Sequence, residues 1–213
     1  IKPDFLLVDG NKADIKHYKQ ESIIDGDQKS LSIAAASIIA KVSRDRMMRQ
    51  YDIVFPEYGF AKHKGYGTKQ HMKAITTRKA SPIHRKSFNP VPLHLPTFAY
   101  LKRNRLIGRL GKQLTACQFI RKGHEILETN YNVPKVGEID IISRDASILV
   151  FTEVKTQTAG HAWEEPSPHI DENKGDRIMN AVQHYMESHK LNCDFRFDVG
   201  EVMLGKGKTE IRI

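Results

Sequence analysis

Apolar residues occur with two different periods along the chain and predict a mixed α/β protein. Two short apolar segments near the start, residues 5–8 and 21–24, end at turn-forming Asp, Gly and Asn residues and are predicted strands. Residues 31–49 are predicted to form a helix, with small and aliphatic side chains in its first turns and charged side chains in its last. We expect the first turns, residues 33–40, to be buried and closely packed.

The remainder of the chain shows the same mixture of elements. A basic loop with two glycines over residues 63–68 leads into a predicted short helix over 69–77. The later predicted elements are, in order, a helix over 100–122, strands over 125–131, 138–142 and 147–155, a helix over 173–189, and strands over 195–199, 202–204 and 210–213. This order indicates a compact α/β unit.

Prolines mark a boundary between two parts of the chain. Residues 89–96 contain three prolines, and proline removes a main-chain donor and interrupts regular structure. We therefore predict a linker over residues 92–99, between a first domain over 1–91 and a second domain over 100–213.

The net charge of +9 is divided unevenly between these parts. Residues 1–92 contain 17 Lys and Arg against 9 Asp and Glu, a balance of +8, whereas residues 93–213 contain 17 against 16, a balance of +1. A basic excess in one part indicates a nucleic-acid partner, although a basic surface that only confers solubility has the same composition.

Composition excludes a membrane protein. Charged residues make up 28% of the chain, and no apolar run approaches the roughly 20 residues that cross a bilayer. The two cysteines, Cys117 and Cys193, form neither a disulfide framework nor a zinc site. We expect a cytoplasmic protein.

Two aspartates of the first part stand where a strand pattern ends, Asp9 in Asp9-Gly10-Asn11 and Asp27 in Asp25-Gly26-Asp27. Carboxylates that converge there suit Mg²⁺ or Mn²⁺, and such an ion can activate water for phosphodiester cleavage. Asp-Gly is also a common turn dipeptide, so the spacing alone leaves both interpretations open.

The second part contains another candidate set. Asp140 begins one strand of a predicted hairpin, and Glu153 and Lys155 end the other, so Asp140 and Glu153 can face each other and Lys155 shares the face of Glu153. Two acids for a metal and a lysine near the reacting water make a nuclease constellation. A cross-strand ladder of exposed ion pairs has the same pattern, and spacing does not separate the two interpretations.

Motifs in the first part resemble the C-terminal half of ribonuclease HII. They cover nearly all of residues 1–91 in the order and at the spacing of that family. They are Leu7-Val8-Asp9-Gly10-Asn11, Ile24-Asp25-Gly26-Asp27, the run from Ser32 to Asp45, the run from Phe55 to Phe60, His63-Lys64-Gly65-Tyr66-Gly67-Thr68, His71, and the run from His84 to Pro90.

This resemblance implies an RNase H-like fold and metal-dependent cutting of RNA in RNA–DNA hybrids, including single ribonucleotides embedded in duplex DNA. It implies that Asp9 and Asp27 are two of four metal-binding carboxylates. The other two form an Asp-Glu pair in an Asp-Glu-x-Gly-Arg-Gly segment of the family, which has no match in this sequence. We expect that part of the domain to lie upstream of Ile1, and the chain alone to be inactive through this site.

The same resemblance assigns residues that contact substrate. Tyr66 matches the family tyrosine that stacks near the ribose at the RNA–DNA junction, although it could also shield the glycine turn. Several cations are candidate phosphate contacts or simply solvated charges. They are Lys41, Arg44, His63, Lys64, His84 and Arg85.

Residues of about 100–204 resemble the YraN-like family, which is similar to Holliday-junction resolvases of the PD-(D/E)xK nuclease superfamily. The matching motifs are Gly137-Glu138-Ile139-Asp140, Phe151-Thr152-Glu153-Val154-Lys155 and Arg196-Phe197-Asp198-Val199. The resemblance implies a small restriction-endonuclease-like α/β domain. One departure is that Gly111 is followed by Lys112, where the family has an acid that contacts metal.

The sequence therefore predicts a metal-dependent ribonuclease H type endonuclease, fused to a YraN-like domain. Its catalytic and metal-binding residues would be Asp9, Asp27, Asp140 and Glu153, with Lys155 as a further catalytic residue. The alternative is a non-catalytic nucleic-acid-binding or scaffold protein with a degenerate nuclease-fold domain. Lys112 favours the alternative, and the intact Asp140, Glu153 and Lys155 favour the nuclease.

Overall fold

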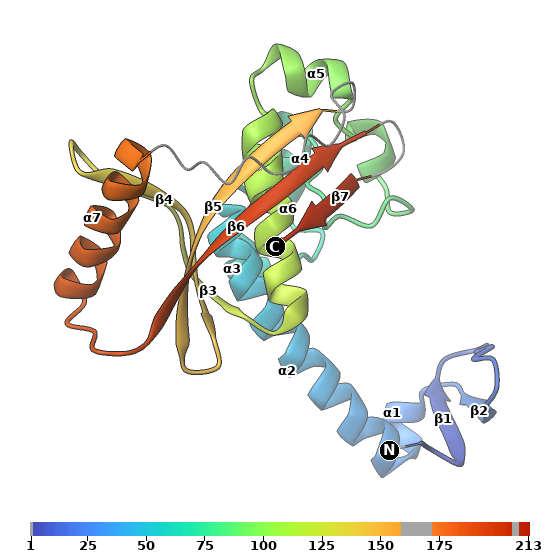
Figure 1. The fold of residues 1–213 in the computed structure, drawn as a ribbon. Coiled ribbons are helices and arrows are strands. Elements are labelled where there is room, and N and C mark those ends of the chain that lie inside the picture. The colour runs from blue at the N-terminus through green and yellow to red at the C-terminus, as the bar shows by residue number, and fades with distance from the viewer. Residues whose placement is uncertain (1, 159–171, 206–208) are drawn as a thin grey trace. The chain divides into compact units, whose positions relative to one another are not determined.

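The computed structural model describes residues 2–158, 172–205 and 209–213, and its contacts divide the chain into two compact units, Ile1–Met48 and Arg49–Ile213. The elements of the first unit are β1 (Phe5–Asp9), β2 (Lys19–Ile23), α1 (Gly26–Lys29) and most of α2 (Leu31–Val54) (Figure 1). The second unit contains the end of α2, η1 (Pro56–Tyr58), α3 (Phe60–His63), α4 (Lys69–Arg78), η2 (Val91–His94), α5 (Phe98–Arg103), α6 (Ile107–Lys122), β3 (Glu125–Val133), β4 (Gly137–Asp145), β5 (Ile148–Thr158), α7 (Glu172–Ser188), β6 (Phe195–Leu204) and β7 (Thr209–Arg212).

The two strands predicted near the start of the chain are confirmed and form a parallel pair. Their register runs from Phe5 opposite Lys19 to Asp9 opposite Ile23. Both strands therefore end at the same edge, and the main-chain N–H of Gly10 donates a hydrogen bond of 3.0 Å to the carbonyl of Ile23 there. This edge is where the predicted carboxylates are found.

The long helix is confirmed, but its expected burial is wrong. Ile33 is buried against Gly26 of α1, whereas Ile38 and Ile39 are 65% and 66% exposed. The elements β1, β2 and α1 have only 5, 5 and 4 residues. They provide too little apolar surface to cover the first turns of α2.

The second unit is built on one five-stranded sheet with the order β3-β4-β5-β6-β7. The β5–β6 pair is parallel, and the other three pairs are antiparallel. The β3–β4–β5 meander comes from short turns, whereas the parallel β5–β6 pair needs a crossover, which contains α7. This arrangement confirms the α/β class predicted for the second part.

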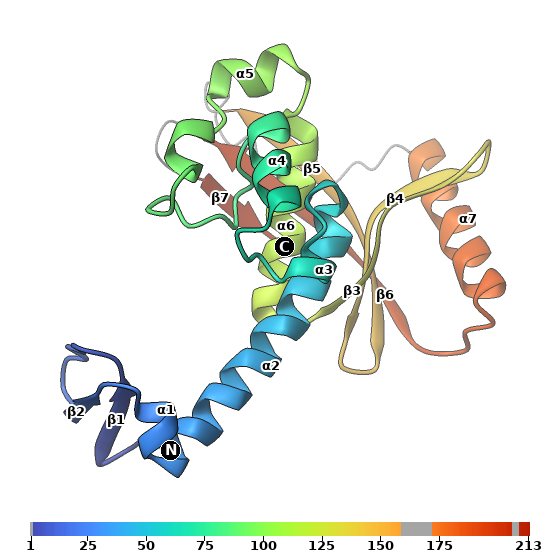
Figure 2. The same cartoon turned by 180° about the vertical axis from the view of Figure 1, so that it is seen from behind.

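Helices α6 and α7 cover opposite faces of β5. A Cβ atom at Gly111 in α6 would overlap the side chain of Thr156, so this glycine allows a close approach of α6 to β5. Phe151 packs against Tyr185 of α7, with ring centroids 5.8 Å apart. Because successive side chains of a strand point to opposite faces, residues 151 and 156 face different helices. Figures 1 and 2 show α6 along one face of the sheet.

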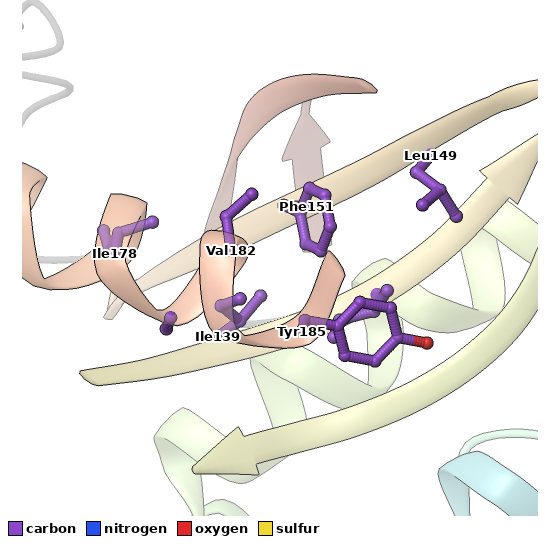
Figure 3. Packing of buried hydrophobic residues seen from close by; sticks show 8 residues of the cluster. Ile139, Leu149, Phe151, Ile178, Val182 and Tyr185 are labelled. Carbon is purple, nitrogen blue, oxygen red and sulfur yellow. The ribbon is translucent and has the colours of Figure 1, made fainter. Parts of the chain in front are cut away.

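One apolar core cluster lies between α7 and the β4–β5 pair (Figure 3). Helix α7 contributes residues spaced three and four apart, which places them on one stripe. The fully or nearly fully buried members are Ile139, Ile142, Leu149, Phe151, Ile178, Ala181, Val182 and Tyr185.

Two predicted elements differ from the structure. The helix predicted over 100–122 is divided into α5 and α6, because Arg105 adopts a left-handed conformation with φ 55°, which ends a helix. The strands predicted over 195–199 and 202–204 form one strand, β6, in which Gly200 continues the pairing and faces Thr115 of α6.

The predicted linker lies inside the second unit. Residues 91–94 form η2, Val91 is buried, and the N–H of Ala80 donates a hydrogen bond of 2.8 Å to the carbonyl of His94. Contacts also join the end of α2 to the sheet, since Gln50 Oε1 accepts from the N–H of Ile126 at 2.5 Å. The contact division at Met48 is therefore distinct from the proline-rich segment, and the domain limits 1–91 and 100–213 stay a prediction.

Candidate metal and nucleic-acid sites

Asp9 and the turn that contains Asp27 are connected by one hydrogen bond. The Oδ1 atom of Asp9 accepts a bond of 2.8 Å from the N–H of Gly26, the residue before Asp27. Asp27 does not stand directly after a strand as expected, because the chain turns at Asp25 after β2 and Asp27 lies in α1. Both aspartates are exposed. The structure thus brings the two predicted carboxylates to the same edge of the β1–β2 pair.

These carboxylates fit part of a site for a hard divalent cation. Mg²⁺ and Mn²⁺ prefer carboxylate oxygens. The hydrogen bond from Gly26 uses one oxygen of Asp9 and fixes its orientation. Over residues 2–158, 172–205 and 209–213, no group of three or more His, Cys, Asp or Glu side chains could hold a metal. Asp9 and Asp27 could each supply carboxylate oxygens to such an ion, and their role as metal ligands stays a prediction.

Lys41, a predicted phosphate contact, lies on the surface of α2. Its Nζ atom is 3.1 Å from Oδ2 of Asp45, one helical turn further along. The Lys41 side chain is 67% exposed. A pair of this kind contributes at most about 1 kcal/mol, so a phosphate can compete for the ammonium group.

The loop that carries Tyr66 is fixed by hydrogen bonds to His63 and His71. Tyr66 is 59% exposed, and its N–H donates a bond of 2.8 Å to the carbonyl of His63. His63 differs from its prediction as a phosphate contact, because it is buried and its two ring nitrogens bond main-chain groups. These are the carbonyl of Tyr58 at 2.8 Å and the N–H of Gly65 at 3.2 Å. Lys64 follows at the C-terminal end of α3.

A chain of hydrogen bonds connects Ser81, His84, His71 and Tyr66. The N–H of Ser81 donates to Nδ1 of His84 at 3.0 Å, and the Nε2 atoms of His84 and His71 are 3.0 Å apart. Nδ1 of His71 lies 3.0 Å from the carbonyl of Tyr66. Because Ser81 N–H only donates and the Tyr66 carbonyl only accepts, each ring carries one proton and all donors point from Ser81 toward Tyr66.

Both of these histidines are shifted toward the neutral form. Burial, with a smaller contribution from nearby His71, lowers the pKa of His84 to about 4. Burial is also the largest cause that lowers the pKa of His71. His63 stacks on His71 with ring centroids 4.5 Å apart, so a second positive charge would be unfavourable there.

Arg85 is exposed next to this cluster. Its guanidinium carbon is 6.0 Å from the ring centroid of Phe88, a cation–π distance. Because Arg85 is exposed, its guanidinium group is accessible to phosphate oxygens. Tyr66, Lys64 and Arg85 belong to the second unit, and Asp9, Asp27 and Lys41 to the first.

In the sheet, the β4–β5 pairing ends one residue before Asp140 and Glu153. Ile141 pairs with Thr152, so Asp140 and Glu153 are the next residues of the two strands. Asp140 is 3% exposed and Glu153 is 7% exposed. Lys155 is half-buried and lies two residues beyond Glu153 on β5. These three residues thus stand at neighbouring positions of β4 and β5, and their role as a nuclease site stays a prediction.

Each of the two carboxylates is bound by a lysine from a helix. Nζ of Lys112 in α6 lies 2.5 Å from Oδ1 of Asp140, and the N–H of Val154 donates 2.7 Å to Oδ2. Lys174 in α7 forms an ion pair with Oε1 of Glu153. This bond is the largest cause that raises the pKa of Lys174. The pair therefore does not fit a divalent metal in this structure, and the predicted metal ligands Asp140 and Glu153 hold ammonium groups.

Sequence reasoning did not find Lys174. It is separated from Glu153 by 21 positions and comes from a different element, so no short motif contains both residues. The one indication in the sequence is that Lys174 lies near the start of the helix predicted after β5, which could bring it close to Glu153. Lys112, by contrast, was visible because it directly follows Gly111 in the expected motif.

A serine, a histidine and an aspartate also meet in the sheet. Nδ1 of His124 lies 3.3 Å from Oγ of Ser143, and its Nε2 lies 3.7 Å from Oδ2 of Asp145. Ser143 has no exposed surface, so its hydroxyl cannot reach a substrate. Arg196 pairs with Asp145 at 3.0 Å and with Asp198 at 3.2 Å. The Arg196-Phe197-Asp198 motif therefore supports an ion-pair network that holds β4 to β6.

Comparison with known proteins decides which families these two segments resemble. Residues 1–91 match the family model of ribonuclease HII. The ribonuclease HII segment contains Asp9, Asp27 and the Tyr66 loop. Residues 112–202 match uncharacterised protein family UPF0102, which is YraN-like. The UPF0102 segment begins at Lys112 and contains Asp140 and Glu153. Both resemblances seen in the sequence are confirmed.

Curated relatives match the ribonuclease HII segment. Two proteins named ribonuclease HII, from Limosilactobacillus reuteri strain DSM 20016 and Limosilactobacillus reuteri subsp. reuteri strain JCM 1112, are each 54% identical over 94 residues. The match covers 44% of this chain and 36% of each relative. The chain thus spans about a third of the length of these relatives.

No helix in the described part of the chain has both the length and the apolar character to cross a bilayer.

Proposed function

We propose that the ribonuclease HII segment supplies part of a metal-dependent endonuclease. This enzyme degrades the RNA strand of RNA–DNA hybrids and cuts duplex DNA on the 5′ side of an embedded ribonucleotide, leaving a 3′-hydroxyl and a 5′-phosphate. The observation that carries the proposal is the hydrogen bond from the N–H of Gly26 to Asp9, which joins Asp9 to the residue before Asp27.

Asp9 and Asp27 hold Mg²⁺ or Mn²⁺ in this proposal. When bound, the ion supplies activation of water and stabilises the leaving oxygen. Tyr66 stacks on the ribose of the ribonucleotide, and its exposed ring supports this role. Lys41, Lys64 and Arg85 contact phosphates, which agrees with the balance of +8 in residues 1–92. His63 holds the loop and does not touch the substrate.

Two further carboxylates complete the site. The sequence contains counterparts of two family carboxylates and none of the Asp-Glu-x-Gly-Arg-Gly segment. We therefore expect the chain alone to bind hybrids without cutting them.

The free thiols of Cys117 and Cys193 support a cytoplasmic location.

The UPF0102 segment has a second candidate role as a non-catalytic scaffold or nucleic-acid-binding module. The ion pairs of Lys112 with Asp140 and of Lys174 with Glu153 favour this role. The nuclease alternative rests on the intact Lys155 and would require the ion pairs of Lys112 and Lys174 to open.

A fusion tests the proposal for the ribonuclease HII segment. The N-terminal part of the Limosilactobacillus reuteri ribonuclease HII, which is expected from the family resemblance to supply the Asp-Glu pair, is joined in front of this chain. We expect Mn²⁺-dependent cleavage of a labelled duplex with a single ribonucleotide, at its 5′ side. Asp9→Asn and Asp27→Asn should each lower the rate by at least about a hundredfold, since each removes a charge that holds the metal.

The matched control is Asp14→Asn, an exposed carboxylate of the same unit. It should leave the rate unchanged. Full activity of the Asp9→Asn fusion would contradict the assignment of the site.

A further inference from the structure

The buried carboxylates of the sheet are neutralised by side chains of the protein itself. Asp140 and Glu153 carry two negative charges at positions that are 3% and 7% exposed. Buried carboxylates require a partner of opposite charge, because water no longer solvates them. Lys112 supplies one positive charge to Asp140 and Lys174 supplies one to Glu153, and Asp140 also acts electrostatically on Lys174. The net charge of these four side chains is zero before any ion binds.

Lys112 is held over Asp140 by the packing of its helix. Gly111 lets α6 approach β5 closely, because any side chain at this position would overlap Thr156. The next residue then reaches Asp140, with its Nζ 2.5 Å from Oδ1, and it also donates to Oδ1 of Asn130 at 3.3 Å. Its side chain is only 28% exposed. The contact is therefore anchored by a close helix–strand approach.

Both oxygens of Asp140 are in use. Oδ1 binds the Lys112 ammonium group, and Oδ2 accepts the main-chain N–H of Val154 at 2.7 Å. Glu153 binds Lys174, which comes from the other helix, α7. A divalent cation could enter only by displacing at least one ammonium group, and the positive charge of that group would then repel it.

We propose that Asp140, Glu153, Lys112 and Lys174 form a lysine-closed site, in which two ammonium groups take the place of a divalent metal. The UPF0102 segment then binds neither Mg²⁺ nor Mn²⁺. Replacing Lys112 by glutamate removes a positive charge and adds a third carboxylate next to Asp140, which makes an oxygen site for these ions. This inference does not depend on the proposed function of the ribonuclease HII segment.

The test measures Mn²⁺ binding to the full chain. Electron paramagnetic resonance reports the concentration of free Mn²⁺. Asp9→Asn and Asp27→Asn are present in every protein, so that the other candidate metal site does not contribute. We expect no binding by this parent at millimolar Mn²⁺. Adding Lys112→Glu should create saturable binding at millimolar Mn²⁺, and adding Asp140→Asn to that protein should remove it.

The matched control is Lys122→Glu, an exposed lysine at the end of the same helix, which makes the same change in net charge. It should create no binding. A second variant, Lys112→Gln, removes the ammonium group without adding a carboxylate and should bind more weakly than Lys112→Glu. Circular dichroism verifies that each variant is folded.

Two results would overturn the lysine-closed site. One is sub-millimolar Mn²⁺ binding by the parent that disappears with Asp140→Asn, because the lysines would then leave the carboxylates for metal. The other is a folded Lys112→Glu protein that binds no better than the Lys122→Glu control. A comparison of the wild type with the Asp9→Asn, Asp27→Asn parent separately tests the metal site of the ribonuclease HII segment.

Discussion

At the scale of single residues, the neutral histidines behind the Tyr66 loop form an ordered set of donors and acceptors. An added proton on Nδ1 of His84 would face the N–H of Ser81, and one on Nε2 of His71 would face His84. Protonation of either ring therefore removes the hydrogen bond that its acceptor nitrogen accepts, from Ser81 or from His84, whereas Nδ1 of His71 still donates to the carbonyl of Tyr66.

His84 makes the stability of the second unit depend on pH. Its pKa is about 4 in the folded protein and 6.5 in an unfolded chain, so the unfolded chain takes up the proton first. The contribution of His84 is fully present above pH 6.5 and is lost as the pH falls from 6.5 toward 4. The free energy of unfolding should decrease by at most about 1.4 kcal/mol per pH unit, less any screening by solvent.

Urea denaturation at several pH values between 4 and 7.5 measures this slope for the wild type and for His84→Gln. The variant cannot take up the proton and should show a shallower slope. Equal slopes for both proteins would contradict a neutral, buried His84.

At the same scale, the charge of residue 112 decides the chemistry of the sheet site. Two unit charges 4 Å apart interact by about 4 kcal/mol at an effective dielectric of about 20. A change from an ammonium to a carboxylate group changes the sign of that interaction with a bound cation. One residue can therefore separate a metal site from a lysine-closed site on the same strands.

At the scale of elements, the approach of α6 to β5 rests on a missing side chain. Gly111→Ala should destabilise the protein by about 1–3 kcal/mol, because the new methyl group overlaps Thr156 in a packed interface. Thermal unfolding followed by circular dichroism measures the loss.

Gly108→Ala is the control for helix propensity. Gly108 lies in the same helix, and a Cβ atom there meets nothing within 4 Å. Alanine should stabilise the helix at this position by up to about 1 kcal/mol. If Gly111→Ala and Gly108→Ala change the stability in the same direction and by the same amount, close packing of Gly111 against Thr156 is contradicted.

At the scale of the whole molecule, the boundary in net charge and the boundary between the compact units lie at different places in the chain. The excess of +8 lies in residues 1–92, whereas the contact division lies at Met48. The basic segment therefore contributes residues to both units, and within the second unit Gln50 of this segment accepts a hydrogen bond from the N–H of Ile126 in the sheet.

Binding of an RNA–DNA hybrid should weaken as salt increases, because the phosphate contacts release counterions. Lys64→Gln together with Arg85→Gln should reduce the slope of log K against log salt by about 2, since two phosphate contacts are lost. Fluorescence anisotropy at several KCl concentrations measures this slope. The pair Lys122→Gln and Lys190→Gln, both exposed cations of the less charged part, should leave the slope unchanged. Equal effects of the two pairs would contradict phosphate contacts at Lys64 and Arg85.

The sequence by itself determined most elements, the two family resemblances and the position of Asp9, Asp140 and Glu153 on their strands. Strand alternation, glycine turns and helical stripes act over a few residues, so their consequences can be predicted locally. The long helix shows the limit of this reasoning. Its apolar first turns predicted burial, but burial of Ile38 requires a partner surface, which the short elements of the first unit do not provide.

Only the tertiary structure decided what the candidate residues contact. The pairing of Lys174 with Glu153 joins α7 to β5, and the bond between His71 and His84 joins α4 to a loop. Such contacts depend on how separate elements pack, and no periodicity within one element encodes them. For this reason the sequence could place two acids side by side in the sheet, while the fold determined that lysines bind them.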